Sequence, residues 1–213
     1  MTDAMTVTAI EKTYFKGRFR VYLDGEAWLT LERATLSALG IAEGALIDAE
    51  ELAVRSAPLE AACARERALA MLDRSAKTRH EIERDLQRRQ YQPEAVAFAV
   101  ESMARYAFID DEGIARRTVE AGVGRLSRRA VDQKLRARGI ERDAIGEALD
   151  AYSDDDEREA AMREVRKRLL GKTIDPELVR KTVQALARKG FSFDVARDAV
   201  RAVTDSGEDD WEN

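Results

Sequence analysis

The adjacent aspartates Asp110 and Asp111 are the first residues in this sequence whose type and spacing could do chemistry. Two neighbouring carboxylates can hold a divalent cation or act as an acid and a base, provided that further ligands converge on them. They can also open a helix, because carboxylates close to a helix N-terminus interact favourably with its exposed backbone N–H groups. A second acidic cluster, "SDDDE" at 153–157, also precedes a helical pattern. This recurrence favours helix capping over a metal site.

The other candidates for chemistry lack necessary partners. His80 is the only histidine, and Arg84 stands at the i+4 position where a zinc-binding helix needs a second ligand. Cys63 is the only cysteine and has no general base beside it in the sequence. "RLLGKT" (168–173) lacks the first glycine of a phosphate-binding loop, and "GVGRLS" (122–127) lacks the third glycine of a dinucleotide-binding turn. We therefore predict a binding protein rather than an enzyme, with no catalytic residue, metal or cofactor.

Clusters of basic residues are the strongest signal for a partner. The segment 125–142 has seven basic residues against two acidic ones. A helix over 127–138 would bury Val131 and Leu135 and expose most of the cations. Such a face is either a solvated surface or a surface for phosphates or acidic protein groups. Aromatic residues are not interleaved with these cations, which gives little support to stacking on single-stranded bases. The predicted partner-binding residues are Arg125, Arg128, Arg129, Arg136 and Arg138, with Arg84, Arg88 and Arg89 before them and Arg188 and Lys189 after them.

The composition indicates helices as the elements that position these residues. The 213 residues are 45% hydrophobic and 36% charged and include only three prolines, which is typical of long amphipathic helices. The net charge is −5, but residues 64–204 carry 30 basic against 26 acidic residues. One cysteine forms no intrachain disulfide, and neither a secretory signal nor an apolar span is apparent. A cytoplasmic protein without membrane contact is expected.

The N-terminal part has a different pattern. Residues 6–15 and 18–31 alternate apolar and polar side chains, which predicts strands of a small sheet. Phe19, Val21 and Leu23 should face one side of that sheet, and Arg18, Arg20 and Tyr22 the other. A short helix should end at Gly40, and Pro58 is expected to open the next helix.

From residue 64 onward the helical pattern repeats. Leu86, Leu135 and Leu186 are spaced 49 and 51 residues apart, and each is followed by the same series of residue types. A base comes three positions later, then Gly or Gln, then an apolar residue, which is typical of a helix that ends in a left-handed turn. Each unit of about 50 residues is thus predicted to hold three helices.

The repeated segments carry a resemblance to a known family. "ALAMLDRSAKTRHEIERDLQRRQY", "ARYAFIDDEGIARR" and "SRRAVDQKLRARGI" resemble, in order and spacing, the RecX family of regulators of the bacterial recombinase RecA. Thr78 stands where the family has Ser, Gln90 where it has Gly, and Ile114 where it has Phe. The resemblance covers about residues 64–204. It implies a modulator, usually an inhibitor, that binds the RecA–DNA filament and suppresses ATP hydrolysis and strand exchange.

We therefore expect a mainly α protein whose tandem three-helix repeats form an elongated curved rod, with a small β-containing N-terminal region. The partner would be the RecA filament, with DNA contacted inside it, and the protein would be a monomer. An independent, architectural nucleic-acid-binding protein is the alternative. The predicted parts are a strand-rich region (1–60), repeats one (61–109), two (110–153) and three (154–204), and an acidic tail (205–213).

Overall fold

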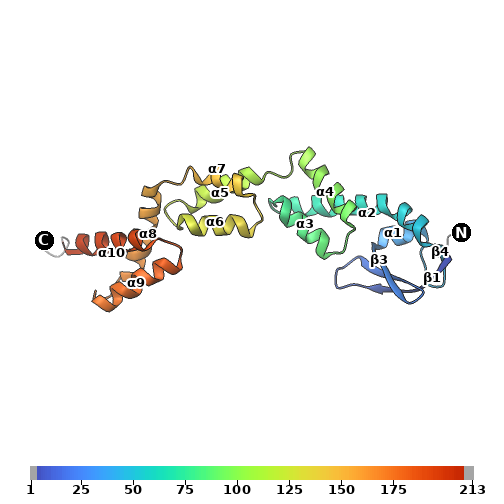
Figure 1. Ribbon diagram of the computed structural model, residues 1–213, viewed down its shortest axis with the longest axis horizontal. Helices are drawn as coiled ribbons and strands as arrows, with labels where there is room; N and C mark the ends of the chain where they lie inside the picture. The colour runs from blue at the N-terminus through green and yellow to red at the C-terminus, as the bar shows by residue number, and fades with distance from the viewer. Residues whose placement is uncertain (1–3, 209–213) are drawn as a thin grey trace. The chain divides into compact units, whose positions relative to one another are not determined.

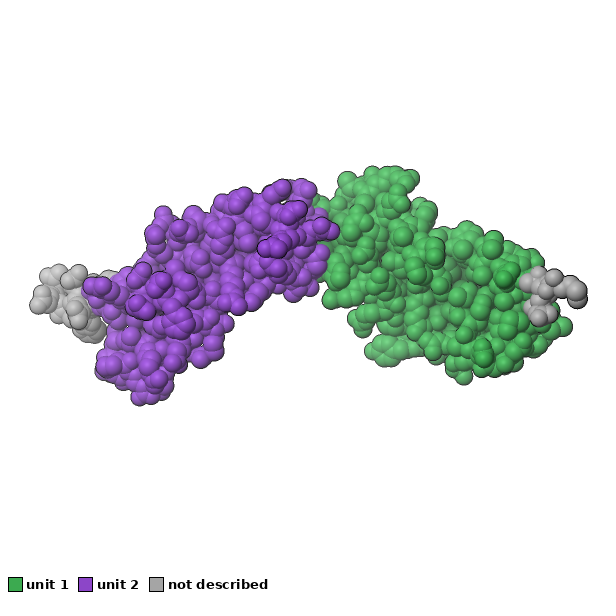
Figure 2. Space-filling model, in the orientation of Figure 1, with its two compact units in different colours: residues 1–110 green, residues 111–213 purple. Residues whose placement is uncertain are grey.

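In the computed structural model, residues 4–208 are described, and they form ten helices and one four-stranded sheet (Figure 1). The chain folds into two compact units, residues 1–110 and 111–213 (Figure 2). The predicted class, mainly α with a small β-containing N-terminal region, is confirmed. The acidic tail lies, from residue 209 on, outside the described residues. None of the helices between residues 4 and 208 is both long and apolar enough to cross a membrane.

The first unit begins with an antiparallel sheet in the order β3-β2-β1-β4. Val21 and Leu23 are buried in its core and Phe19 packs against them, which confirms the predicted apolar face. The short helix α1 (Arg33–Leu39) covers this core and ends at Gly40, whose φ is 66°, as predicted. The strands are β1 (Ala4–Lys12), β2 (Arg18–Leu23), β3 (Glu26–Glu32) and β4 (Leu46–Asp48).

One long helix, α2 (Ala49–Leu72), joins the sheet to the first group of helices. The prediction that Pro58 opens a helix is wrong, because α2 begins at Ala49 and contains Pro58 in its interior. An interior proline costs about 3 kcal/mol, since it removes a hydrogen bond and crowds the preceding turn. Burial of one leucine-sized side chain contributes about 1.5–3 kcal/mol, so an extended buried stripe outweighs the proline. That stripe consists of Leu52, Ser56, Glu60, Ala64, Ala68 and Met71.

The helices form three successive groups, each with its own core. The helices α2, α3 and α4 share one core, α5 to α7 a second and α8 to α10 a third. Each group buries the apolar stripe of its helices, because an amphipathic helix is stable only when that stripe is covered. The bounds are α3 (Arg79–Arg88), α4 (Pro93–Arg105), α5 (Asp111–Gly122), α6 (Arg128–Ala137), α7 (Arg142–Leu149), α8 (Asp154–Leu169), α9 (Pro176–Arg188) and α10 (Phe193–Glu208).

The same turn ends the middle helix of each group. Leu86, Leu135 and Leu186 are completely buried, which confirms that this column of the repeat is core. Four residues later the backbone takes a positive φ, and the next backbone N–H donates to the carbonyl of the leucine, as in a Schellman motif. The positive φ values are 60° at Gln90, 74° at Gly139 and 93° at Gly190. These N–H···O hydrogen bonds run from Tyr91 to Leu86 (3.2 Å), from Ile140 to Leu135 (3.3 Å) and from Phe191 to Leu186 (3.2 Å).

The acidic clusters open helices, as predicted. Asp111 is the first residue of α5, and α8 begins after Ser153, whose hydroxyl accepts the backbone N–H of Asp156 (3.1 Å). Hydrogen bonds from the Ser153 side chain and backbone hold the pKa of Asp156 below its usual value. In the described part of the chain, no group of three or more His, Cys, Asp or Glu residues is arranged to hold a metal ion. Asp111 and the aspartates 154–156 lie in the first turns of α5 and α8, where carboxylates interact favourably with the exposed backbone N–H groups.

Candidate functional site

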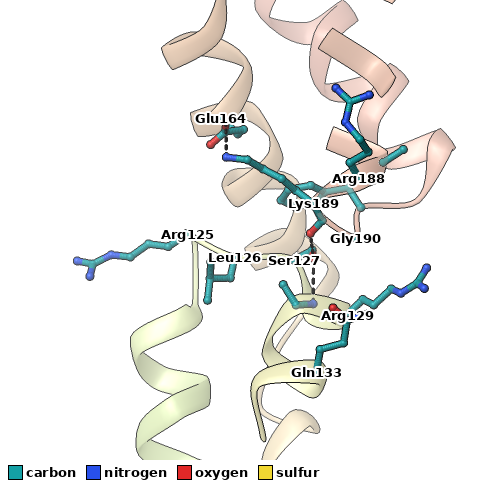
Figure 3. Close-up of a pocket in the computed structure, with 12 residues that line it drawn as sticks. Arg125, Leu126, Ser127, Arg129, Gln133, Glu164, Arg188, Lys189 and Gly190 are labelled. Atoms are coloured by element: carbon teal, nitrogen blue, oxygen red, sulfur yellow. Dashed lines mark hydrogen bonds and ion pairs between the residues drawn. The ribbon is translucent and has the colours of Figure 1, made fainter. Parts of the chain in front are cut away.

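A hollow of about 580 Å³ in the second unit brings basic residues from two helix groups together. We call it the basic pocket and define it by Arg125, Arg129, Arg188 and Lys189. Arg125 lies on the connection between α5 and α6, and Arg129 lies in the first turn of α6. Arg188 and Lys189 end α9 (Figure 3). Four of the predicted partner-binding residues thus line one hollow, although the two pairs are about 60 positions apart in the sequence.

Ser127 joins the two sides of the basic pocket. Its hydroxyl accepts the backbone N–H of Ala130 (3.1 Å), so Ser127 is the N-cap of α6. The same hydroxyl donates to the backbone carbonyl of Lys189 (2.8 Å), at the turn after α9. Ser127 is 1% exposed, so water does not compete for these hydrogen bonds. One buried side chain therefore caps α6 and fixes the turn between α9 and α10 beside it.

Gly190 makes this approach possible. Its φ of 93° is in the region that L-residues rarely adopt, and a Cβ atom there would lie 2.7 Å from Ser127 Oγ and 3.3 Å from Arg129 Cβ. Glycine is thus needed for the backbone conformation and for the close contact between the two helix groups.

Replacing Gly190 by Ala is expected to lower the free energy of unfolding of the second unit by about 2–4 kcal/mol, the sum of backbone strain and displaced packing. Gly171→Ala is the matched control, because Gly171 also has a positive φ (70°) but has no atom within 4 Å of the added Cβ. The control should lose about 1–2 kcal/mol from strain alone. Urea unfolding of both variants measures the difference, and equal losses would show that the contact with Ser127 is not tight.

A second set of contacts positions the connection that carries Arg125. The hydroxyl of Tyr152, in the connection between α7 and α8, donates to the backbone carbonyl of Leu126. Burial, and then the nearby carboxylates of Glu157 and Asp156, raise the pKa of Tyr152 to about 12, so the hydroxyl keeps its proton. Arg128 Nη1 donates to the backbone carbonyl of Tyr152 (3.1 Å). The sequence predicts Arg128 as a partner-binding residue on an exposed helix face. In the structure it is half-buried and links the start of α6 to the connection between α7 and α8.

The charge of the basic pocket is only partly neutralised. Lys189 Nζ lies 2.6 Å from Glu164 Oε1 on α8, and the Glu164 side chain is 18% exposed. Within residues 4–208, no salt bridge involves Arg125, Arg129 or Arg188. Figure 3 shows that the side chains of Arg125, Arg129 and Arg188 extend in different directions, away from the Glu164–Lys189 pair. This arrangement is suited to several anionic groups spread over a surface rather than to one enclosed ion.

Sequence reasoning missed two cations beside the basic pocket. Arg163 and Lys167 lie four residues apart on α8 and line a smaller hollow together with Arg125 and Glu164. Their i, i+4 spacing in "MREVRK" indicates a shared helix face. The sequence contains no signal that this face lies beside Arg125.

The other predicted partner-binding residues lie elsewhere. Arg136 is exposed and pairs with Asp132 on the same helix (2.7 Å), and Arg138 is the half-buried C-cap of α6. In the first unit, Arg84 and Arg88 are exposed on α3, and Arg89 pairs with Asp85 (2.8 Å). These five residues do not line the basic pocket. Their role in partner binding stays a prediction.

The chemistry of the basic pocket is recognition of anions. Guanidinium groups donate several hydrogen bonds in a fixed plane and remain protonated, so they bind phosphates and carboxylates well. The lining includes one hydroxyl, that of Ser127, which is already engaged with Ala130 and Lys189. The lining pairs no nucleophile with a general base.

Comparison with known proteins places these helix groups in a family. Residues 64–103 match the model of "RecX, first three-helix domain", and residues 155–200 match that of "RecX, third three-helix domain". The chain is 30% identical to Regulatory protein RecX of Caldanaerobacter subterraneus subsp. tengcongensis over 162 residues, which are 76% of this chain and 82% of the relative. It is 34% identical to Regulatory protein RecX of Thermobifida fusca over 138 residues, which are 62% and 74% of the two chains.

Solved structures agree on the fold. A crystal structure of regulatory protein RecX matches with a TM-score of 0.61 and 23% identity, covering 94% of this chain and 99% of that one. The crystal structure of RecX from Lactobacillus salivarius matches with a TM-score of 0.60 and 19% identity, covering 68% and 97%. Together with the sequence matches, these comparisons identify the chain as a member of the RecX family of regulatory proteins.

Proposed function

We propose that this protein modulates a RecA-type recombinase as an inhibitor, by binding the recombinase–DNA filament and suppressing its ATP hydrolysis and strand exchange. The observation that carries the proposal is the basic pocket, where Arg125, Arg129, Arg188 and Lys189 meet on a chain whose net charge is −5. A nucleoprotein filament presents phosphates and protein carboxylates, and both attract such a surface. The family supports the recombinase as the partner.

The mechanism follows from the physical character of the site. The basic pocket has no catalytic groups, so the protein would act by occupying the filament and shifting it toward a state that hydrolyses ATP slowly. A ligand shifts such an equilibrium only by as much as it binds one state better than the other. We propose that a monomer acts in this way in the cytoplasm, with DNA contacted inside the filament.

Co-sedimentation of the protein with recombinase filaments tests the proposal. Filaments assembled on single-stranded DNA should carry the protein into the pellet at physiological salt, and ATP hydrolysis should fall in proportion to the protein bound. Bare duplex DNA at the same salt is the control, since an architectural DNA-binding protein would bind it equally well. Equal binding to bare duplex, without an effect on ATP hydrolysis, would contradict the proposal. The amount bound per recombinase would separate coating of the filament, near stoichiometric, from capping of its ends.

A further inference from the structure

The hairpin between β1 and β2 presents an aromatic ring among cations in the first unit. Tyr14, near its tip, is 93% exposed, and the side chains of Lys12 and Lys16 are exposed on either side of it. Residues 12–20 include four basic residues and no acidic one. An exposed tyrosine is unremarkable by itself, but one flanked by cations is the combination that proteins use to bind single strands.

The hairpin tip is held in a defined conformation. The backbone N–H of Thr13 donates to the carbonyl of Arg18 (3.0 Å), and that of Arg18 donates to the carbonyl of Phe15 (3.1 Å). The Phe15 ring lies under the guanidinium of Arg89 (5.0 Å), and the ring of Tyr14 meets it edge to face (5.4 Å). Because these contacts hold the backbone of the tip, little backbone conformational entropy would be lost when a ligand binds there.

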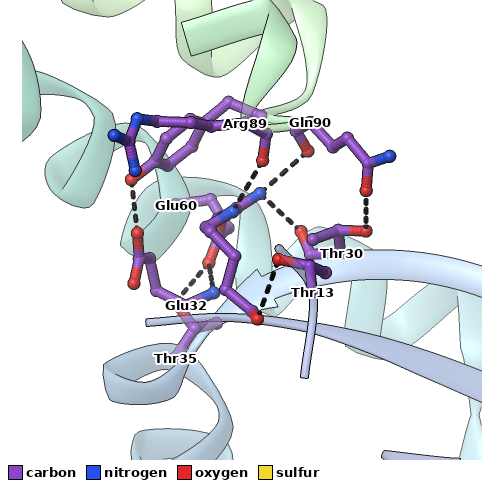
Figure 4. Close-up of polar contacts among 9 residues, drawn as sticks. Thr13, Thr30, Glu32, Thr35, Glu60, Arg89 and Gln90 are labelled. Carbon is purple, nitrogen blue, oxygen red and sulfur yellow. Dashed lines mark hydrogen bonds and ion pairs between the residues drawn. The ribbon is translucent and has the colours of Figure 1, made fainter. Parts of the chain in front are cut away.

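A buried network anchors the hairpin to the turn between α3 and α4 (Figure 4). Arg18, 1% exposed, donates from Nε to the carbonyl of Arg89 (2.9 Å) and from Nη2 to that of Gln90 (2.8 Å). Its Nη1 pairs with the buried carboxylate of Glu60 on α2. The hairpin and the end of α3 are thereby one rigid surface.

Gln90 belongs to the same surface. It takes the positive φ of 60° where the other two repeats have glycine. Its side-chain oxygen accepts hydrogen bonds from Thr30 Oγ1 (2.7 Å) and Arg20 Nη2 (2.9 Å). The departure from glycine at this position thus has a local reason, which is the contact with the sheet.

The acidic groups near the hairpin are already engaged. Glu11 accepts the hydroxyl of Tyr22 (3.1 Å), and Glu32 accepts that of Tyr91 (2.6 Å). Burial alone would raise the pKa of Asp85, but its hydrogen bonds from Arg67 and Arg89 outweigh this and hold the pKa below its usual value. A hydrogen bond from a neutral hydroxyl leaves a carboxylate charged, so Glu11, which also lines the hollow beside Tyr14, keeps its negative charge. The three cations of the hairpin, Lys12, Lys16 and Arg20, outnumber it.

A shallow hollow of about 280 Å³ lies beside Tyr14, lined in part by Lys12, Arg20 and Tyr22. This volume is below the about 300–1,000 Å³ of pockets that enclose drug-sized ligands. Its size is suited to one ring or one phosphate of a longer chain rather than to a whole small molecule.

We propose that this hairpin binds single-stranded nucleic acid, with a base stacked on Tyr14 and the adjacent phosphates contacted by Lys12, Lys16 and Arg20. Single strands are favoured over duplexes because only an unpaired base offers its face to a protruding ring. The inference goes beyond the proposed function, since it concerns a bare strand and the first unit, whereas the basic pocket lies in the second.

The test is fluorescence anisotropy of a labelled oligothymidylate titrated with the full chain at low salt. Tyr14→Ala should weaken binding by about 5- to 100-fold, as loss of one base–aromatic stack does, and Tyr14→Phe should bind nearly as wild type. Phe98→Ala is the matched control, because Phe98 is an exposed aromatic residue (51%) of the same unit outside the hairpin. It should leave the affinity unchanged, and all three variants should keep the wild-type melting temperature.

An abasic oligonucleotide separates stacking from phosphate contact. It should bind wild type and Tyr14→Ala with equal, weak affinity, because it retains the phosphates but lacks the bases that would stack on Tyr14. Oligothymidylate binding that is the same for wild type and Tyr14→Ala would overturn the proposal. A second contrary outcome would be a Tyr14→Ala variant that binds the recombinase more weakly than wild type in the absence of DNA but binds the oligonucleotide as wild type does. The hairpin would then contact protein rather than a nucleic acid strand. Loss of filament inhibition on charge reversal in the basic pocket tests the proposed function separately and leaves this result unaffected.

Discussion

Replacing Glu60 by Gln is expected to lower the free energy of unfolding of the first unit by about 3–5 kcal/mol, as removal of one partner from a buried ion pair does. Glu60 is 2% exposed and Arg18 is 1% exposed, so the guanidinium would remain buried without its counter-charge. Gln keeps the size of the side chain and an oxygen for the hydrogen bonds from Thr35 Oγ1 (2.6 Å) and Glu32 N (2.8 Å). With its oxygen used in this way, the Gln amide NH2 would face Arg18 Nη1, so the substitution removes both the counter-charge and the hydrogen-bond acceptor of the buried guanidinium.

The measurement is urea unfolding followed by the fluorescence of Trp28, a β3 residue of the first unit. Trp211→Phe in all proteins makes Trp28 the only tryptophan. Glu51→Gln is the control, since it removes one charge from an exposed ion pair with Arg55 on the same helix, and it should cost at most about 1 kcal/mol. A loss at Glu60 no larger than that of the control would mean that the buried pair contributes no more than a surface pair.

Reversing three charges of the basic pocket is expected to weaken filament binding by about 100-fold or more and to abolish inhibition. The variant combines Arg125→Glu, Arg129→Glu and Arg188→Glu, the three pocket arginines that have no salt bridge in residues 4–208. Like charges placed against an acidic partner cost several kcal/mol, and about 3 kcal/mol corresponds to that change in affinity. If phosphates are contacted, the salt dependence of binding should also become shallower by about two to three counterions.

The choice of residues protects the fold. Arg128 is left in place because it donates to the carbonyl of Tyr152, and Lys189 because it pairs with Glu164. The control reverses Arg116, Arg158 and Arg201, whose side chains are 61%, 62% and 82% exposed in the same unit and lie outside the pocket. Both variants change the net charge equally. Filament co-sedimentation that falls equally in both would indicate a general charge effect, and wild-type binding by the pocket variant would exclude the pocket as the contact.

Local structure was readable from the sequence because it depends on spacing along the chain. The leucines of the repeat are buried at the predicted positions. The turn after each leucine is closed by one backbone hydrogen bond, such as that from Tyr91 N–H to the Leu86 carbonyl. The alternation of Phe19, Val21 and Leu23 likewise determines one face of a strand. These features involve residues within a few positions of one another, so residue types and intervals are enough to predict them.

The course of α2 required the tertiary structure. Proline inside a helix is unfavourable locally, so the sequence indicated a helix start at Pro58. The helix continues from Ala49 to Leu72 because its buried stripe is covered by the sheet at one end and by α4 at the other. Packing over the whole length of the helix outweighs the cost of one proline. A local sequence pattern shows the proline but not the packing, so it cannot predict which of the two is larger.

The two candidate binding surfaces show the same division. The sequence identified Arg125, Arg129, Arg188 and Lys189 as cations on helix surfaces. Tertiary contacts bring them into one pocket, among them the hydrogen bond from Ser127 to Lys189, 62 positions away, and the close approach of Gly190 to Arg129. The folded chain likewise places the Phe15 ring of the hairpin beside Arg89, although the two residues are far apart in the sequence. Spacing determines which face of an element a side chain occupies, whereas packing between elements decides which faces meet.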